Sequence, residues 1–287
     1  MSRAIPFTLL KGKLPLKFIV CGHLVQDGNH LVASYYRYPS LEEFDAFIIW
    51  FRKLGYKFVG LNDYLKEDDQ KKVLLTFDDG FKTVFDNLHP YMLKNEIPYM
   101  LFIMTDPLSD PGFQIKTLRR DLTLVNSEDR LFLSENEIAK LKDQGVHIGF
   151  HTRSHYKIKE NYLDNEECLN QLRIPARCLH LFSQPLCFAY PYYAPDDYAS
   201  FNHYMKENFN YTYFFDTKGF FPNRSNHFFR ISMDVEKKVM PENWLRFVIK
   251  RQLLFLIMSQ NFDFKKAPLP SREEFGLWAV QAFLFDL

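Results

Sequence analysis

The stretch Val73-Leu-Leu-Thr-Phe-Asp-Asp-Gly80 runs from an apolar segment directly into two adjacent carboxylates and a glycine. Residues 73–77 are apolar or β-branched without alternation, which predicts a strand buried on both faces. Asp78 and Asp79 then fall at the carboxyl end of this strand, the edge at which α/β folds build their sites. Gly80 permits a turn immediately afterwards, so we expect both carboxylates to reach one cavity. Two carboxylates that close together repel each other unless a cation lies between them, and a divalent metal is the first candidate.

Strand and helix patterns alternate on both sides of this stretch. Further strands are predicted at residues 17–22, 56–61, 99–105, 147–151, 187–189, 211–216 and 228–233. Helices are predicted at residues 40–54, 83–95, 134–145, 165–172 and 196–208. Two of them open with a capping box, Ser40 with Glu43 and Ser134 with Glu137. The repeated strand–helix order predicts a parallel sheet, and about seven such units favour its closure into a barrel. Residues 106–130 show turn residues and charges without periodicity, which predicts a long loop.

Composition limits the classes of function. The 36 basic and 35 acidic residues nearly cancel, which excludes the electrostatic footprint of a nucleic-acid-binding protein. The 287 residues, 47% of them hydrophobic, suffice for one large α/β domain with a sizeable core. Aromatic residues reach 17%; biased composition is the simpler explanation, and a sugar-stacking surface is the functional alternative.

Cysteine usage and hydropathy bear on the compartment. No CxxC spacing occurs, so we expect buried thiols in a reducing compartment at Cys21, Cys168, Cys178 and Cys187. Neither a signal-type apolar core nor a segment of membrane-spanning length is found in the sequence. Residues 244–258 predict a packed amphipathic helix, and peripheral membrane contact through it is left open. The expected location is the cytoplasm.

A second motif, Ile148-Gly-Phe-His-Thr-Arg-Ser-His155, places two histidines four residues apart directly after a predicted strand. On a helical turn, this spacing puts both imidazoles on one face, where they can hold one metal ion. Alone, the pair is weak evidence, because His151 and His155 could both be exposed loop residues. Since it falls at the same sheet edge as the two aspartates, a shared site is favoured. Imidazole and carboxylate ligands suit zinc, with cobalt, nickel or iron as alternatives, and three ligands leave a position open for water.

Three motifs, Thr76-Phe-Asp-Asp-Gly80, His151-Thr-Arg-Ser-His155 and Phe188-Ala-Tyr-Pro-Tyr192, carry a resemblance to a known family. They are similar to the first three motifs of the polysaccharide deacetylases, also called the NodB-homology or carbohydrate esterase 4 family. The resemblance extends over about residues 17–234. It implies a distorted (β/α)7 barrel and metal-dependent removal of the N-acetyl group from an amino sugar. We therefore expect one catalytic domain over residues 1–287, with a C-terminal helical extension at about 241–287.

The resemblance also implies residue roles. Asp78 would be the catalytic base, while Asp79, His151 and His155 would bind the metal. The backbone N–H of Tyr192 would help to stabilise the oxyanion. These roles suit amide hydrolysis, because the metal polarises a poor electrophile, a nearby carboxylate takes a proton from water, and the oxyanion requires a fixed donor.

The chain departs from the commonest family pattern in its general acid. The family often carries a Leu-x-His motif near its C-terminus, but residues 253–258 contain no histidine. Instead, Ile19-Val-Cys-Gly-His23 places a histidine at the end of the first predicted strand. This arrangement resembles circularly permuted members such as the poly-N-acetylglucosamine deacetylases. We predict that His23 is the general acid; the alternative is a strand-end histidine without a catalytic role.

Other departures affect the pocket. Ala189 stands where many members have an arginine, Tyr193 replaces a glycine, and Phe150 replaces a small residue. We expect each of these changes to narrow the pocket or to alter the substrate. Arg230 is a candidate for orienting a site carboxylate, with a surface position as the alternative. Four histidines without ligand spacing are interpreted as ordinary polar residues: His147, His180, His203 and His227.

The favoured function is a cytoplasmic, metal-dependent deacetylase. Its substrate would be a saccharide, a nucleotide-linked sugar or a lipid-linked sugar used in assembly of a cell-surface glycan. A deformylase or another amide hydrolase on the same barrel is an alternative, because the metal and the base do not define the acyl group. A non-catalytic glycan-binding or scaffold protein that retains the metal site is another. A glycosidase is excluded, because its carboxylates must flank the substrate at roughly 5 Å or more.

Overall fold

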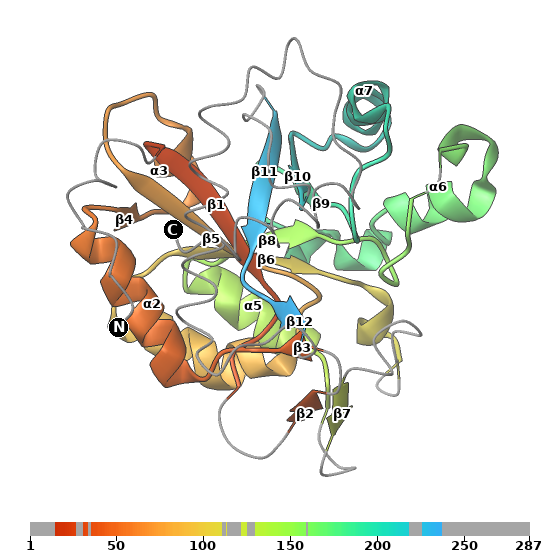
Figure 1. Ribbon diagram of the computed structural model, residues 1–287. Helices are drawn as coiled ribbons and strands as arrows, with labels where there is room; N and C mark the ends of the chain where they lie inside the picture. The colour runs from red at the N-terminus through yellow and green to blue at the C-terminus, as the bar shows by residue number, and fades with distance from the viewer. Residues whose placement is uncertain are drawn as a thin grey trace.

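Seven parallel strands form a closed barrel in the computed structural model, which describes residues 15–26, 31–33, 36–110, 113, 122–124, 130–158, 160–217 and 226–236 (Figure 1). In order around the ring, the strands are β1 (Lys17–Gly22), β5 (Lys72–Phe77), β6 (Tyr99–Ile103), β8 (His147–Phe150), β9 (Cys187–Ala189), β10 (Tyr213–Asp216) and β11 (His227–Ser232). The ring closes because β1 pairs with β5 on one side and with β11 on the other. This architecture confirms the barrel predicted from the sequence.

Helices lie around the barrel and connect its strands (Figure 1). They are α2 (Leu41–Lys53), α3 (Leu61–Leu65), the π-helix η1 (Val84–Leu88), α4 (His89–Lys94), α5 (Glu135–Asp143), α6 (Glu166–Leu172) and α7 (Tyr198–Phe209). Short 3-10 segments are η2 (Asp106–Leu108), η3 (Tyr162–Asp164) and η4 (Ala176–Leu181). Both predicted capping boxes are present, at Ser40 before α2 and at Ser134 before α5. Within the described residues, no helix combines the length and apolarity needed to cross a membrane.

Three local predictions need correction. The strand expected at residues 56–61 is only β4 (Lys57–Phe58), which pairs with β5 outside the ring. The single helix expected at residues 83–95 begins as a π-helix. The loop expected at residues 106–130 contains η2 and β7 (Leu122–Leu124), and β7 pairs with β2 (Leu31–Ala33). Sequence patterns missed this pairing because its partner lies about ninety residues away.

Two further segments complete the described fold. A second small sheet pairs β3 (Tyr36–Arg37) with β12 (Val235–Glu236). Both small sheets lie on the same side of the barrel in Figure 1. The helix predicted at residues 244–258 and the extension at residues 241–287 lie outside the described residues.

The barrel interior is filled by one apolar cluster. It contains Ile19, Leu74, Met100, Phe102 and Phe215, all fully buried. Gly149 of β8 is required here, because a Cβ at this position would lie 2.5 Å from the Phe102 ring. The interior is therefore a packed core, with buried polar side chains at both ends of β5: Lys72 at the amino end and Thr76 near the carboxyl edge.

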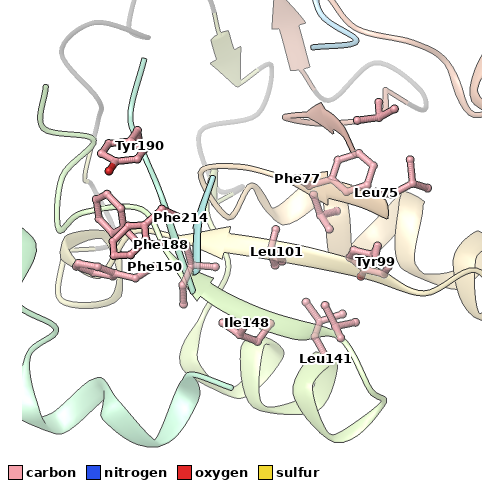
Figure 2. Close-up of a cluster of buried hydrophobic side chains, with 14 of the residues drawn as sticks. Leu75, Phe77, Tyr99, Leu101, Leu141, Ile148, Phe150, Phe188, Tyr190 and Phe214 are labelled. Carbon is pink, nitrogen blue, oxygen red and sulfur yellow. The ribbon is translucent and has the colours of Figure 1, made fainter. Parts of the chain in front are cut away.

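A larger core fills the space between barrel and helices, and Figure 2 shows part of it. Phe150 belongs to this outer core, where its ring packs against those of Phe182, Phe188 and Tyr211. Side chains alternate along a strand, so the residue before His151 faces away from the site. The expectation that Phe150 narrows the pocket is therefore wrong. The four cysteines are buried free thiols, as predicted.

Candidate active site

The barrel register brings three distant chain segments together at the carboxyl edge. Gly22 of β1 lies opposite Phe77 of β5, and the N–H of Asp78 donates to the Gly22 carbonyl at 2.9 Å. On the other side of β1, the N–H of Met233 donates to the Cys21 carbonyl at 2.7 Å. His23 therefore follows a strand that is held between the segments leading to Asp78 and to Asp234.

Asp79, His151 and His155 form a compact group of possible metal ligands. Each offers one ligand atom, and these atoms all lie within 4.8 Å of one another. Asp79 Oδ1 lies 3.4 Å from His151 Nε2 and 3.5 Å from His155 Nε2. Ligands about 2.0–2.2 Å from a tetrahedral zinc ion are about 3.3–3.5 Å apart. The two separations from Asp79 Oδ1 therefore fit an ion that it shares with each histidine.

The hydrogen bonding of this group also fits a metal. Both carboxylate oxygens of Asp79 are buried and receive no hydrogen bond from the described residues. His151 Nδ1 lies 2.9 Å from the Ala189 carbonyl oxygen, which can only accept, so Nδ1 carries the proton. In the neutral imidazole, Nε2 then presents a lone pair to Asp79. Burial, the largest influence, lowers the pKa of His155 to about 4 and keeps this imidazole neutral near pH 7. The Asp79 carboxylate and the lone pairs of the two imidazoles are all acceptors. With no proton between them, these groups need a cation to be stable so close together.

The backbone of the site adopts left-handed conformations. Positive φ angles occur at Asp79 (71°), Thr152 (61°), His155 (60°) and Tyr192 (67°). The two histidines are therefore brought together by a non-helical turn in which Thr152 and His155 have positive φ, and the predicted helical turn is wrong. Such conformations are costly for residues with a side chain and are typical of functional sites. At Gly80 the φ angle is +76°, as the predicted turn requires.

Asp78 forms a buried, two-pronged ion pair with Arg230. Arg230 Nη1 donates to Asp78 Oδ1 at 2.6 Å, and Nη2 donates to Oδ2 at 2.8 Å. The same Nη1 lies 3.2 Å from Thr76 Oγ1, and the whole arginine is buried. Burial alone would raise the pKa of Asp78, but the charged Arg230, with help from the protonated His23, holds it below its usual range. The alternative that Arg230 is a surface residue is thus excluded. Many family members have an arginine where this chain has Ala189, and in this chain β11 supplies a guanidinium.

His23 forms the second charged pair of the site. Its Nδ1 is hydrogen-bonded to Asp234 Oδ2, and its Nε2 lies 3.8 Å from Asp79 Oδ2. Burial disfavours the charged ring, but Asp234, followed by Asp79 and Asp78, raises the pKa of His23 to about 10. The protonated imidazole can therefore donate a proton from Nε2. Sequence reasoning missed Asp234, although it follows β11 at the same barrel edge.

Tyr192 lies in a tight turn after β9. The N–H of Tyr193 donates to the Pro191 carbonyl at 3.0 Å, which together with the positive φ of Tyr192 defines a γ-turn. Thr217 Oγ1 donates to the Tyr192 carbonyl. Asp216 Oδ1 accepts the N–H groups of Ala194 at 3.2 Å and Thr217 at 2.7 Å. The end of β10 therefore anchors the turn that carries Tyr192, which no sequence motif indicated.

The structure corrects the interpretation of His227 as an ordinary polar residue. It is buried, its Nδ1 lies 2.9 Å from Asn202 Nδ2, and its Nε2 lies 3.7 Å from Asp216 Oδ2. Asn202 in turn accepts a hydrogen bond from the hydroxyl of Tyr190. This buried network lies beside the Asp216 carboxylate that anchors the Tyr192 turn, without a hydrogen bond from His227 Nε2 to it.

The profile of the polysaccharide deacetylase family matches residues 65–213, more than half of the chain, and contains all three motifs. The chain belongs to the polysaccharide deacetylase family. Membership supports carbohydrate de-N-acetylation as its activity. The matched region begins after β1 and ends in β10, so it includes the metal-ligand candidates and Asp78 but not His23, Arg230 or Asp234.

Solved deacetylase structures share the fold. IcaB from Ammonifex degensii is 20% identical with a TM-score of 0.54, covering 82% of this chain and 97% of that chain. A de-N-acetylase from Aggregatibacter actinomycetemcomitans is 16% identical with a TM-score of 0.56, covering 81% of this chain and 99% of that chain. The Streptococcus pyogenes deacetylase PplD, in complex with acetate, is 17% identical with a TM-score of 0.52, covering 80% and 96%. No curated protein sequence matches the chain.

Proposed function

We propose that this family member removes the N-acetyl group from an amino sugar in a metal-dependent reaction, with zinc as the favoured ion. The supporting observation is the contrast between two adjacent carboxylates. Asp78 is held by Arg230 through both oxygens, whereas Asp79 has no hydrogen bond from the described residues and faces histidine nitrogens. A cation bound at Asp79 and a general base at Asp78 account for both of these arrangements.

In this proposal, the bound metal would polarise the amide carbonyl and acidify the attacking water. Asp78 takes the proton of that water, since its lowered pKa keeps it ionised and Arg230 fixes the orientation of its carboxylate. The backbone N–H of Tyr192 donates to the developing oxyanion from a turn anchored by Thr217. His23, oriented by Asp234 at Nδ1, gives its Nε2 proton to the leaving amine.

The test is release of acetate from N-acetylated amino sugars before and after complete removal of metal with a chelator. The substrates should include free saccharides, nucleotide-linked sugars and lipid-linked sugars. Release should cease without metal and return on addition of zinc, cobalt or nickel. Unchanged release from the metal-free protein would contradict the mechanism.

Two companion measurements separate the alternatives. N-formyl analogues assayed beside the N-acetyl substrates distinguish a deformylase, which would prefer the smaller acyl group. Glycan binding without acetate release, by a metal-loaded protein, would favour the non-catalytic alternative. The cytoplasmic location and the role in glycan assembly stay predictions, and cell fractionation tests the first of them.

A further inference from the structure

The turn that carries both histidines is held by a helix outside the barrel. Residues 151–155 leave β8 in a non-helical turn, with positive φ angles at Thr152 and His155. Such a backbone is costly for residues with a side chain, so the surrounding structure must maintain it. The N–H groups in the middle of this turn also need acceptors from elsewhere. These acceptors come from α6, which lies at the margin of the fold in Figure 1.

One residue of α6 accepts two consecutive N–H groups of this turn. The N–H of Arg153 donates to the Gln171 backbone carbonyl at 3.2 Å, and the N–H of Ser154 donates to Gln171 Oε1 at 3.0 Å. The Gln171 carbonyl lies in the last turn of α6, where carbonyls have no donor within the helix. The turn and the helix end therefore complete each other's hydrogen bonding. We call these two hydrogen bonds the Gln171 clamp.

The two histidines differ in how their rings are held. His151 Nδ1 is hydrogen-bonded to the Ala189 carbonyl, and this bond orients the ring. His155 Nδ1 is buried and has no hydrogen-bond partner among the described residues. Its ring packs edge-on against that of Tyr192, with the centroids 4.8 Å apart, which is a less directional contact than a hydrogen bond. The position of His155 Nε2 therefore depends mainly on the backbone of the turn.

The clamp is anchored on both of its sides. The end of α6 is fixed by the buried Leu172, whose carbonyl accepts the hydroxyl of Tyr211 at 3.0 Å. In the turn, the Arg153 carbonyl accepts the N–H groups of Thr105 at 3.2 Å and Asp106 at 2.8 Å, which follow β6. The turn is therefore tied both to a helix end and to the end of a barrel strand. Movement of α6 would loosen one of these two attachments.

We propose that Gln171 is a positioning residue of the metal site, which holds His155 beside Asp79 through the backbone of the turn. This inference rests on the proposed metal-dependent function, and it adds a residue that none of the three sequence motifs contains. By linkage, a metal bound at His155 stabilises the clamp by as much as the clamp strengthens metal binding. Occupancy of the site is thereby coupled to a helix outside the barrel.

The experiment measures the zinc dissociation constant of the metal-free protein by competition with a chromogenic chelator. Cobalt or nickel replaces zinc if the parent protein binds one of them more tightly. Gln171→Met keeps the length of the side chain but removes its acceptor, so the dissociation constant should rise about 10-fold. Gln171→Glu keeps an acceptor oxygen and should stay within about 2-fold of the parent protein.

Gln144→Met is the matched control. Gln144 is the C-cap of α5, and its Oε1 lies 2.8 Å from His89 Nε2. The same substitution therefore removes one side-chain hydrogen bond from another helix end. Gln144→Met and Gln171→Met should lower the Tm of the metal-free protein by similar amounts. Gln171→Met alone should weaken zinc binding, which separates positioning from general destabilisation.

Hydrogen exchange measures the reciprocal effect. In the parent protein, zinc should slow the exchange of the amides of Arg153 and Ser154 and of the last turn of α6. In Gln171→Met the protection by zinc should extend to α6 more weakly. Protection of α6 that is the same in both proteins would contradict the coupling.

The remaining outcomes distinguish the clamp from the proposed function. If the parent protein binds zinc and Gln171→Met binds it equally well, Gln171 has no positioning role and the proposed function stands. An equal loss of affinity in Gln144→Met would also overturn the role, because general destabilisation would then explain it. A loss in Gln171→Glu as large as in Gln171→Met would show that the acceptor oxygen is not responsible. A parent protein that binds none of zinc, cobalt and nickel would overturn the proposed function together with the clamp.

Discussion

The proposed metal side and the proposed proton-transfer side of the site satisfy their charges in opposite ways. On the proton-transfer side, Asp78 is paired with Arg230 and His23 with Asp234. On the metal side, the buried oxygens of Asp79 receive no hydrogen bond from the described residues. The chain thus supplies the counter-charge for one carboxylate and leaves the adjacent one for a ligand. This difference predicts which substitutions affect metal content and which affect turnover alone.

The largest effect is expected for Asp79→Asn. Loss of a charged ligand should sharply lower the metal content and reduce kcat/KM by about 10³-fold or more, because carbonyl polarisation is lost with the ion. Elemental analysis together with acetate release measures both quantities. Full metal content in this variant would remove Asp79 from the ligand set.

Asp78→Asn tests the other carboxylate. The variant should keep its metal while kcat falls by about 10²- to 10⁴-fold, the usual contribution of a general base. The two adjacent substitutions are matched controls for each other. Equal loss of metal in both variants would refute the division of roles.

Arg230→Met should destabilise the fold. It leaves the buried carboxylate of Asp78 without its partner, which costs about 3–5 kcal/mol in the free energy of unfolding. The double variant Arg230→Met, Asp78→Asn should recover part of this loss, because no unpaired charge remains. Denaturant unfolding of the two single variants and the double variant measures the coupling. Additive losses would show that the pair does not act as a unit.

His23→Ala should lower kcat by about 10²-fold without loss of metal, because the leaving amine loses its proton donor. Asp234→Asn should have a smaller effect, about 10-fold, because the ring remains but loses its charged partner. Near-normal turnover of His23→Ala would show that the strand-end histidine has no catalytic role.

The smallest effect is expected for Thr217→Val. This nearly isosteric change removes the hydrogen bond to the Tyr192 carbonyl and should lower kcat about 3- to 10-fold with little change in KM. Thr217→Ser keeps the hydroxyl and serves as the control. If Thr217→Ser lost as much activity as Thr217→Val, the hydroxyl would not be what positions the turn.

Local sequence was enough to predict the features that depend on neighbours along the chain. The apolar run before Asp78 and Asp79, the capping boxes at Ser40 and Ser134, and the alternation of strands with helices follow from short-range sterics and hydrogen bonding. The direction in which the Phe150 side chain points was predictable too. His151 lies at the site, and the side chains of adjacent strand residues face opposite sides of the sheet.

Only the tertiary structure decided how the distant segments meet. A strand pattern leaves the hydrogen-bonding partners of that strand open, so the placement of β1 between β5 and β11 could not be derived from residues 17–22 alone. This placement brings His23 to Asp234 and aligns β11 so that Arg230 reaches Asp78. The sequence by itself therefore determined the strand-end motifs and the barrel class. Ring closure decided the charge partners, because it depends on pairing between residues more than 150 positions apart.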